Sequence, residues 1–261
     1  MSSHKPRKRF GQHFLSDPLV IEKIVSLIAP SKTQNIIEIG PGEGVLTQPL
    51  LDYGANLTAI EIDRDLAANL ATKFAEYPNF KIINEDVLKC DVETIVSTQG
   101  ASIVGNLPYN ISTPLLIKLF SHLKLVSTMV FMLQKEVVDR MCALHGNSSF
   151  GRLTIFTQTH CKAEHMFDVP PAAFSPPPKV DSAIVKLKPL DEPIAPTVRE
   201  ALSLITQRAF SQRRKKLKTG LKNLCSAGEL ATLGIDPEQR PDTVSVESYL
   251  SLAKHLVAQQ Q

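Results

Sequence analysis

Apolar residues follow two alternating spacings over positions 18 to about 188 of the chain. Short apolar runs, typical of strands buried on both faces, are separated by stretches in which apolar residues recur at helical intervals. This alternation predicts βαβ units on a mostly parallel sheet, and therefore an α/β fold. The runs predict seven strands, at residues 35–39, 57–62, 81–84, 101–104, 128–133, 160–168 and 182–187.

The helical stretches carry recognisable start signals. Asp17 precedes Pro18, and an acceptor side chain followed by proline is typical of a helix N-terminus, so a helix is predicted over 18–28. The last two predicted strands have no helix between them and are expected to form an antiparallel pair joined by the Pro-rich loop at 169–181. Further helices are predicted over 45–51, 64–76, 114–122, 135–144 and 151–159.

A Pro-rich segment at 189–196 separates this region from a second helical one. Residues 1–190 are therefore expected to form the sheet domain, and residues 191–261 a small α-helical domain. Helices are predicted there over 197–210, 217–224 and 245–259.

Composition narrows the class of protein. With 43% hydrophobic and 21% charged residues, the 261-residue chain is typical of a globular protein. Its basic N-terminus lacks the apolar core of a signal peptide, and no run approaches the roughly 18 apolar residues of a membrane span, so a cytoplasmic location is expected. The four cysteines lack the spacing of metal ligands, so neither a metal site nor a disulfide framework is predicted.

Positive charge is segregated into two stretches without acidic residues. Setting these eleven bases apart from the 29 Lys and Arg residues leaves 18 bases against 26 acids, or −8 for the remainder. A basic arm and a basic helix on an acidic body are typical of a polyanion-binding protein, although a charge run can also be a solvated face. The stretches hold Lys5, Arg7, Lys8 and Arg9, and then Arg208, Arg213, Arg214, Lys215, Lys216, Lys218 and Lys222.

A glycine turn follows the first predicted strand. Gly40, Gly42 and Gly44 alternate there, and such turns bring backbone amides close to a ligand. The turn lacks the fuller spacing of a dinucleotide site, and Glu38 lies on the strand before it. This acidic strand end favours a cationic ligand without phosphate.

Polar residues also follow the next three strands. Glu61, Asp86 and Asn106 stand at these ends, and strand ends of a doubly wound sheet line one crevice. Glu61 could accept from two ribose hydroxyls and Asp86 from an adenine amino group, which matches S-adenosylmethionine. Taken singly, each carboxylate could equally be a helix cap or a surface group.

The tetrapeptide Asn106-Leu107-Pro108-Tyr109 suits a planar amine. The Asn106 oxygen and a carbonyl of Leu107 or Pro108 could accept both amine hydrogens and localise the nitrogen lone pair, while Tyr109 stacks on the ring. This predicts methyl transfer onto nitrogen. The alternative is an ordinary turn after a strand.

Together these segments resemble the ribosomal RNA adenine dimethylase family, and within it the bacterial small-subunit adenine N6-dimethyltransferases of the KsgA type. The resemblance spans most of the sheet domain, and the order and spacing of its motifs also fit. It is carried by residues 10–15, the turn at 38–44, Glu61, Asp86, Asn106 to Tyr109, and residues 174–182.

The resemblance implies a Rossmann-like class I methyltransferase fold and assigns roles to residues. His13 and Leu15 would bind S-adenosylmethionine, although many relatives have Asn at the position of His13. Tyr109 and Phe174 would sandwich the adenine, whereas Phe174 alone would be interpreted as a core aromatic. The catalytic set would be Asn106, Leu107, Pro108, Tyr109 and Phe174, and the cofactor set His13, Leu15, Gly40, Gly42, Glu61, Asp86 and Asn106.

The implied reaction is dimethylation of N6 on two adjacent adenosines in the 3′-terminal hairpin loop of 16S ribosomal RNA, with a role in small-subunit biogenesis. The protein is expected to act as a monomer on the small subunit or its precursor, without metal or membrane. Methylation of large-subunit ribosomal RNA, of DNA adenine or of a protein glutamine amide stays an alternative. So does an assembly factor acting mainly through RNA binding.

Overall fold

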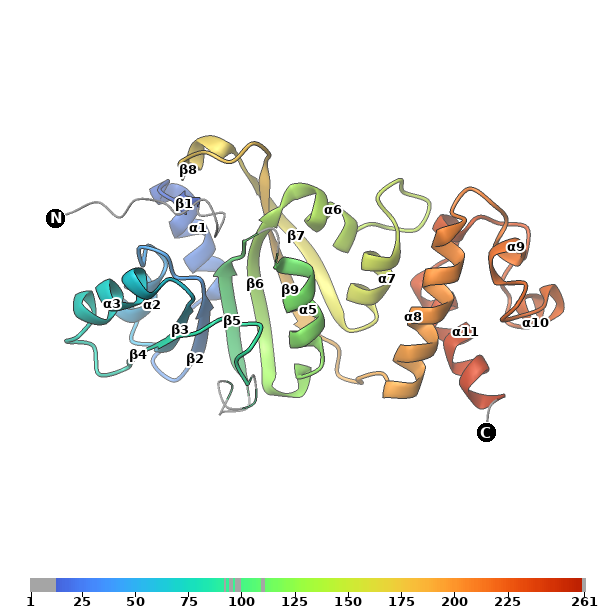
Figure 1. Cartoon of the computed structure of the whole chain (residues 1–261), viewed down its shortest axis with the longest axis horizontal. Helices are drawn as coiled ribbons and strands as arrows, with labels where there is room; N and C mark the ends of the chain where they lie inside the picture. Colours follow the sequence, from blue (N-terminus) through green and yellow to red (C-terminus); the bar gives the residue numbers. More distant parts are fainter. Residues whose placement is uncertain (1–12, 92, 94–95, 97–99, 109–110, 260–261) are drawn as a thin grey trace. The chain divides into compact units, whose positions relative to one another are not determined.

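The computed structural model describes residues 13–91, 93, 96, 100–108 and 111–259 (Figure 1). It divides into two compact units. The first holds Met1–Val138 and Glu164–Pro189, and the second holds Asp139–Ala163 and Leu190–Gln261.

The first unit is built on a seven-stranded sheet of order β4-β3-β2-β5-β6-β9-β7. All pairs from β4 to β6 are parallel, and β9 is antiparallel to β6. The predicted mostly parallel sheet is thereby confirmed, and β7 and β9 are neighbours as predicted. The strands are β2 (Asn35–Ile39), β3 (Asn56–Glu61), β4 (Phe80–Asn84), β5 (Ala101–Asn106), β6 (Val126–Gln134), β7 (Cys161–Val169) and β9 (Ser182–Pro189).

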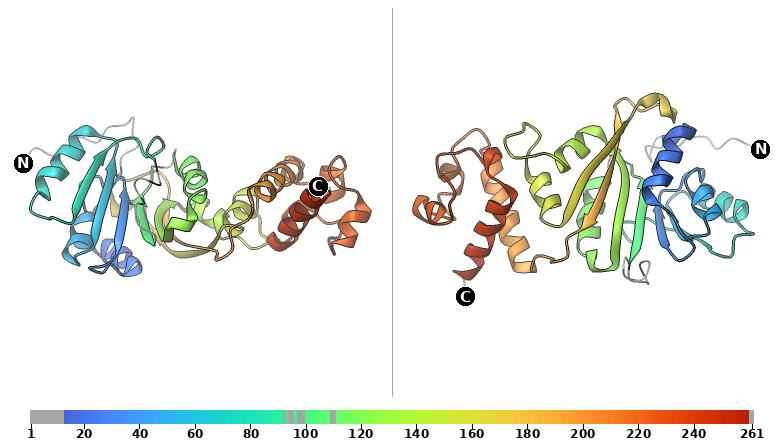
Figure 2. Two further views of the ribbon diagram at one scale, coloured as in Figure 1. Left: turned by 90° about the horizontal axis from the view of Figure 1, so that it is seen from below. Right: turned by 180° about the vertical axis from the view of Figure 1, so that it is seen from behind.

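Helices follow the strands as the sequence pattern predicts. Asp17 caps the first helix through its side chain, which accepts from the Leu19 and Val20 amides. In the two views, α1 and α5 lie on opposite faces of the sheet (Figures 1 and 2). The helices are α1 (Pro18–Ile28), α2 (Thr47–Asp52), α3 (Arg64–Lys73), α5 (Ser112–Phe120) and α6 (Lys135–Met141).

A two-stranded sheet that the apolar pattern does not predict joins distant parts of the chain. The strands β1 (Phe14–Leu15) and β8 (Phe174–Ser175) pair antiparallel, with Leu15 opposite Phe174. The Ser16 amide extends the pairing by donating to the Ala173 carbonyl at 2.8 Å. The segment before α1 is thereby fixed to the loop between β7 and β9.

Chain direction places the functional edge of the sheet. The chain leaves β2 for β3 and β4, and then returns to β5 on the other side of β2. A sheet whose strand order reverses in this way opens a crevice at the carboxyl ends of the strands beside the reversal. The ends of β2, β3 and β5 are therefore where a ligand is expected.

The second unit is helical and has its own core. The core includes the buried Tyr249, whose hydroxyl donates to the Pro241 carbonyl at 2.9 Å. The sequence predicted a boundary near 190 and assigned residues 139–163 to the sheet domain, whereas Phe150 and Ile155 pack in the helical core. The helices are α7 (Arg152–Gln158), α8 (Pro196–Ser211), α9 (Leu217–Leu221), α10 (Ala227–Thr232) and α11 (Val246–Ala258).

None of the helices in the described part of the chain is both long and apolar enough to cross a membrane.

Candidate active site

The glycine turn after β2 depends on backbone conformations that favour glycine. Gly40, Gly42 and Gly44 have φ values of 66°, 58° and 80°. A Cβ atom on Gly42 would lie 3.1 Å from the Phe14 ring, so the turn packs tightly against β1. The sequence predicted the turn, and the structure adds its contact with the N-terminal segment.

Glu61 stabilises this turn from the end of β3. Its carboxylate accepts from the Gly42 amide at 3.2 Å and from the Asp63 amide at 2.9 Å. Burial raises the pKa of Glu61, while these backbone donors lower it. The helix-cap alternative is wrong for Glu61 because Asp63 caps α3, accepting from the Asp65 amide at 3.0 Å.

Glu38 is a second buried acid beside Glu61. Its side chain is 2% exposed, and it accepts from the Thr47 hydroxyl at 2.7 Å. Burial raises the pKa of Glu38 to about 7 against the effect of the Thr47 hydrogen bond, and the charge of Glu61 adds to the rise. Two neighbouring buried carboxyl groups favour a cation in the space that they face.

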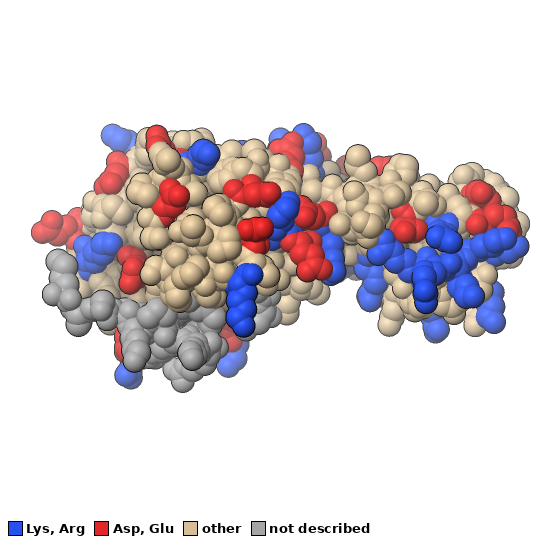
Figure 3. Space-filling model, turned by 90° about the horizontal axis from the view of Figure 1, so that it is seen from above, with Lys and Arg blue, Asp and Glu red and all other residues tan. Residues whose placement is uncertain are grey.

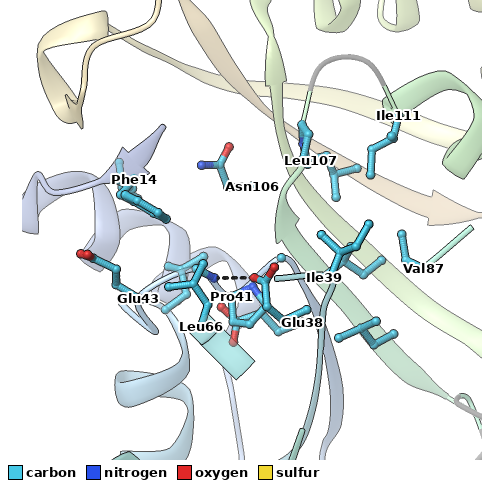
Figure 4. Close-up of a pocket in the computed structure, with 18 of the residues that line it drawn as sticks. Phe14, Glu38, Ile39, Pro41, Glu43, Leu66, Val87, Asn106, Leu107 and Ile111 are labelled. Atoms are coloured by element: carbon cyan, nitrogen blue, oxygen red, sulfur yellow. Dashed lines mark hydrogen bonds between the residues drawn. The ribbon is translucent and has the colours of Figure 1, made fainter. Parts of the chain in front are cut away.

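A cavity of about 210 Å³ opens at this edge of the sheet (Figure 4). None of the described residues that line it is Lys or Arg, whereas five are acidic: Glu38, Glu43, Glu61, Glu85 and Asp86. A pyrophosphate would be repelled here, while the amino and sulfonium groups of S-adenosylmethionine would be attracted. The apolar wall, which suits an adenine ring, includes Ile39, Ile60, Ile62, Leu66, Val87 and Leu88.

Asp86 lies on this wall after β4. Its side chain accepts from the Leu88 amide at 3.0 Å, which forms a tight turn. Asp86 is partly exposed and lines the cavity with Val87 and Leu88. The sequence predicted Asp86 here but not Val87 and Leu88. The two apolar residues directly after the acid could have indicated that this segment lines an apolar wall.

Asn106 ends β5 on the other side of the cavity. Its Nδ2 donates to the His13 carbonyl at 3.1 Å, so Oδ1 is the amide atom that can accept from a substrate amine. The Leu107 amide donates to the Met132 carbonyl at 3.1 Å, which ties the tetrapeptide to β6. Leu107 and Pro108 line the cavity, and Tyr109 lies outside the described residues.

The N-terminal segment closes this side of the cavity. His13 Nδ1 is 2.8 Å from the Pro176 carbonyl oxygen, and both His13 and Leu15 line the cavity. Phe174 does not line it: the side chain is 5% exposed and packs in the same core cluster as Leu15. Its role against an adenine ring stays a prediction.

The structure thus brings most of the predicted site together around one cavity. Phe14 and Ile111 also line it and were not predicted, because neither belongs to a polar strand end. The predicted residues that line it are His13, Leu15, Gly40, Gly42, Glu61, Asp86, Asn106, Leu107 and Pro108.

The second predicted site is the basic stretch around α9, in which some residues pair with acidic side chains and others do not. Lys216 and Lys218 both pair with Glu238, at 2.6 Å for Lys216. Arg213 donates to the Ser148 carbonyl and pairs with Asp242 at 3.4 Å. Four others are exposed and pair with no acid in the described part of the chain, namely Arg208, Arg214, Lys215 and Lys222.

Positive side chains gather over the helical unit in the space-filling view (Figure 3). The predicted N-terminal group, Lys5, Arg7, Lys8 and Arg9, lies outside the described residues.

Comparison with known proteins agrees with this geometry. The family model described as "Ribosomal RNA adenine dimethylase" matches residues 3–258. The "Ribosomal RNA small subunit methyltransferase A" of Methylococcus capsulatus is 47% identical over 97% of this chain and 98% of its own length. The protein of the same name from Nitrosococcus oceani is 48% identical over 97% of this chain and 96% of its own.

Two solved structures share the fold over nearly the whole chain. A dimethyladenosine transferase from Plasmodium falciparum has a TM-score of 0.81 at 27% identity, covering 95% of this chain and 98% of that one. The 23S ribosomal RNA methyltransferase ErmE has a TM-score of 0.75 at 26% identity, covering 94% of this chain and 99% of that one.

The fold and the acidic cavity are those of a Rossmann-like methyltransferase that uses S-adenosylmethionine. Within this class, the chain belongs to the ribosomal RNA adenine dimethylase family.

Proposed function

We propose that this protein dimethylates N6 of two adjacent adenosines in the 3′-terminal hairpin loop of 16S ribosomal RNA, and so takes part in small-subunit biogenesis. The observation that carries the proposal is the orientation of Asn106, whose Nδ2 binds the His13 carbonyl beside the acidic cavity. The near full-length similarity to proteins named small subunit methyltransferase A supports the choice of subunit.

S-adenosylmethionine, when bound, supplies a methyl group on a positively charged sulfur. Glu61 would accept from the ribose hydroxyls, and Asp86 from the amino group of the cofactor adenine. The Gly40 and Gly42 turn lets the backbone approach the ligand without a Cβ atom between them.

The chain's own residues would prepare the target amine. Asn106 Oδ1 and a carbonyl of Leu107 or Pro108 would accept the two N6 hydrogens, which localises the lone pair on nitrogen. Tyr109 and Phe174 would hold the two faces of the extruded base. The amine proton can leave to solvent after transfer, so no buried strong base is needed.

The basic groups would supply affinity for RNA without reading its sequence. Arg208, Arg214, Lys215 and Lys222 are exposed and have no described acidic partner, so they are available to phosphates. Lys5, Arg7, Lys8 and Arg9 would add to this surface. We propose action as a monomer in the cytoplasm on the small subunit or its precursor.

Methylation of large-subunit ribosomal RNA is the second candidate, because ErmE, whose structure is similar, is a 23S ribosomal RNA methyltransferase. The identity with ErmE is 26%, against 47% with the small-subunit relative from Methylococcus capsulatus. This difference favours the small subunit.

The test is transfer of labelled methyl groups from S-adenosylmethionine. The substrates are small subunits from a strain lacking this methylation, naked 16S and 23S ribosomal RNA, and DNA. We expect label in the small-subunit RNA, mapping to two adjacent adenosines. Label confined to 23S RNA or to DNA would contradict the proposal, and RNA binding without transfer would favour an assembly factor.

A further inference from the structure

Lys118, in the last turn of α5, directs its ammonium group at the loop after β4. It donates to the Val87 carbonyl at 3.0 Å, to the Leu88 carbonyl at 2.8 Å, and to the Cys90 carbonyl. An ammonium group has three donors, and here they meet three main-chain acceptors. The cation therefore acts on the conformation of this loop.

The loop forms part of the cavity wall. Asp86, Val87 and Leu88 line the cavity, and the loop turns back on itself where the Cys90 amide donates to the Asp86 carbonyl at 3.1 Å. Partly buried carbonyls need partners, because a carbonyl removed from water and left unpaired destabilises the conformation that buries it. By supplying these partners, Lys118 holds the wall in its observed position.

The other end of α5 continues from the predicted catalytic tetrapeptide. The Ile111 amide donates to the Pro108 carbonyl at 3.1 Å, and Ile111 lines the same cavity. The short helix α5 thus links the two walls of the cavity. It follows the segment 106–108 at its start, and near its end Lys118 binds the loop that holds residues 86–88.

We infer that Lys118 is a positioning residue. It fixes the adenine-binding wall at residues 86–88 at the correct position relative to residues 106–108, where the substrate amine would bind. The inference rests on the proposed function for the assignment of that wall to the cofactor adenine. Lys118 is not among the described residues that line the cavity, so it acts on the site through the loop. Its loss should therefore weaken cofactor binding more than it slows transfer at saturating cofactor.

The test compares Lys118→Met with Lys118→Arg and with Lys124→Met as matched control. Methionine keeps much of the side-chain length but has no donor, whereas arginine keeps the charge with donors in a planar fork that cannot follow three carbonyls. Lys124 is exposed on the short 3₁₀ turn Leu123–Leu125 after α5. Binding of S-adenosylhomocysteine by calorimetry needs neither RNA nor turnover.

We expect Lys118→Met to weaken this binding about tenfold, since charge-assisted hydrogen bonds are lost, and Lys118→Arg to weaken it about threefold. KM for S-adenosylmethionine should rise in parallel while kcat stays within about twofold. Lys124→Met should match the unmodified protein.

Unchanged binding in Lys118→Met, or a fall in kcat with KM unchanged, would overturn the inference. If Lys118→Met does not fold, Lys118→Arg decides, and wild-type affinity in that variant would equally overturn it. Failure of the unmodified protein to methylate small subunits would count against the proposed function, whereas the binding comparison stands without it.

Discussion

At the scale of single residues, the site depends on amides and carboxylates held by backbone partners. Glu61 is fixed by two main-chain amides, and Asn106 by the carbonyl of His13. The two amides bind one Glu61 oxygen each and so fix the orientation of the carboxylate. In Asn106 the contact selects which atom faces the cavity, because the anchored Nδ2 leaves Oδ1 for the substrate. The predicted chemistry needs this selection, since an Asn106 amide turned the other way would present a donor to an amine.

Asn106→Ala should reduce methyl transfer by at least about a hundredfold, because removing one positioned polar contact from an active site has effects of this size. RNA binding should stay within about twofold, since the basic stretch of the helical unit is unaffected. Initial rates with labelled cofactor and RNA filter binding measure the two effects separately.

The matched control is Asn35→Ala, at the amino end of β2 and away from the cavity-lining set. It should leave both measurements unchanged. Comparable losses of transfer and RNA binding in Asn106→Ala would contradict the role assigned to this residue.

At the scale of elements, the parallel strands were predictable because each is an apolar run with a polar residue at its end. β2 begins and ends where the pattern places it, β3 lies one residue earlier than predicted at both ends, and β4 begins one residue earlier. The pair of β1 and β8 was not predictable. Each strand has two residues, too few for any periodicity, and hydrogen bonds between segments about 160 residues apart leave no local signal.

The glycine turn gives the prediction at this scale. Gly42→Ala combines left-handed strain with a Cβ atom 3.1 Å from the Phe14 ring, so it should shift both the turn and β1. We expect a stability loss of about 1–3 kcal/mol in denaturant titrations. We also expect about tenfold weaker binding of S-adenosylhomocysteine, measured by calorimetry.

Gly100→Ala is the control for backbone strain alone. Gly100 has a φ of 89°, and an added Cβ would have no atom within 4 Å. A comparable stability loss with unchanged ligand affinity is expected. If Gly100→Ala weakened binding as much as Gly42→Ala, the effect would come from general destabilisation and not from the turn.

At the scale of the whole molecule, the chain separates its charges by task. The cavity in the sheet unit has acidic residues and no described Lys or Arg, which suits a cationic cofactor. The helical unit carries the basic stretch, which suits a polyanion. The sequence predicted this separation from charge runs alone, but it could not predict which bases pair with acids, because Glu238 and Asp242 lie beyond the run and meet it only in the folded unit.

Two double variants that each remove two positive charges test this difference. Arg214→Gln with Lys215→Gln removes bases that have no described acidic partner, so the negative slope of log Kobs against log salt concentration should become shallower by about 1.4. Lys216→Gln with Lys218→Gln removes bases already paired with Glu238, which are less available to phosphates. In this variant the slope should therefore become shallower by less than about 0.7, the value expected for a single phosphate contact. RNA binding at several salt concentrations measures both slopes, and equal changes would mean that Glu238 does not withhold its two lysines from the RNA.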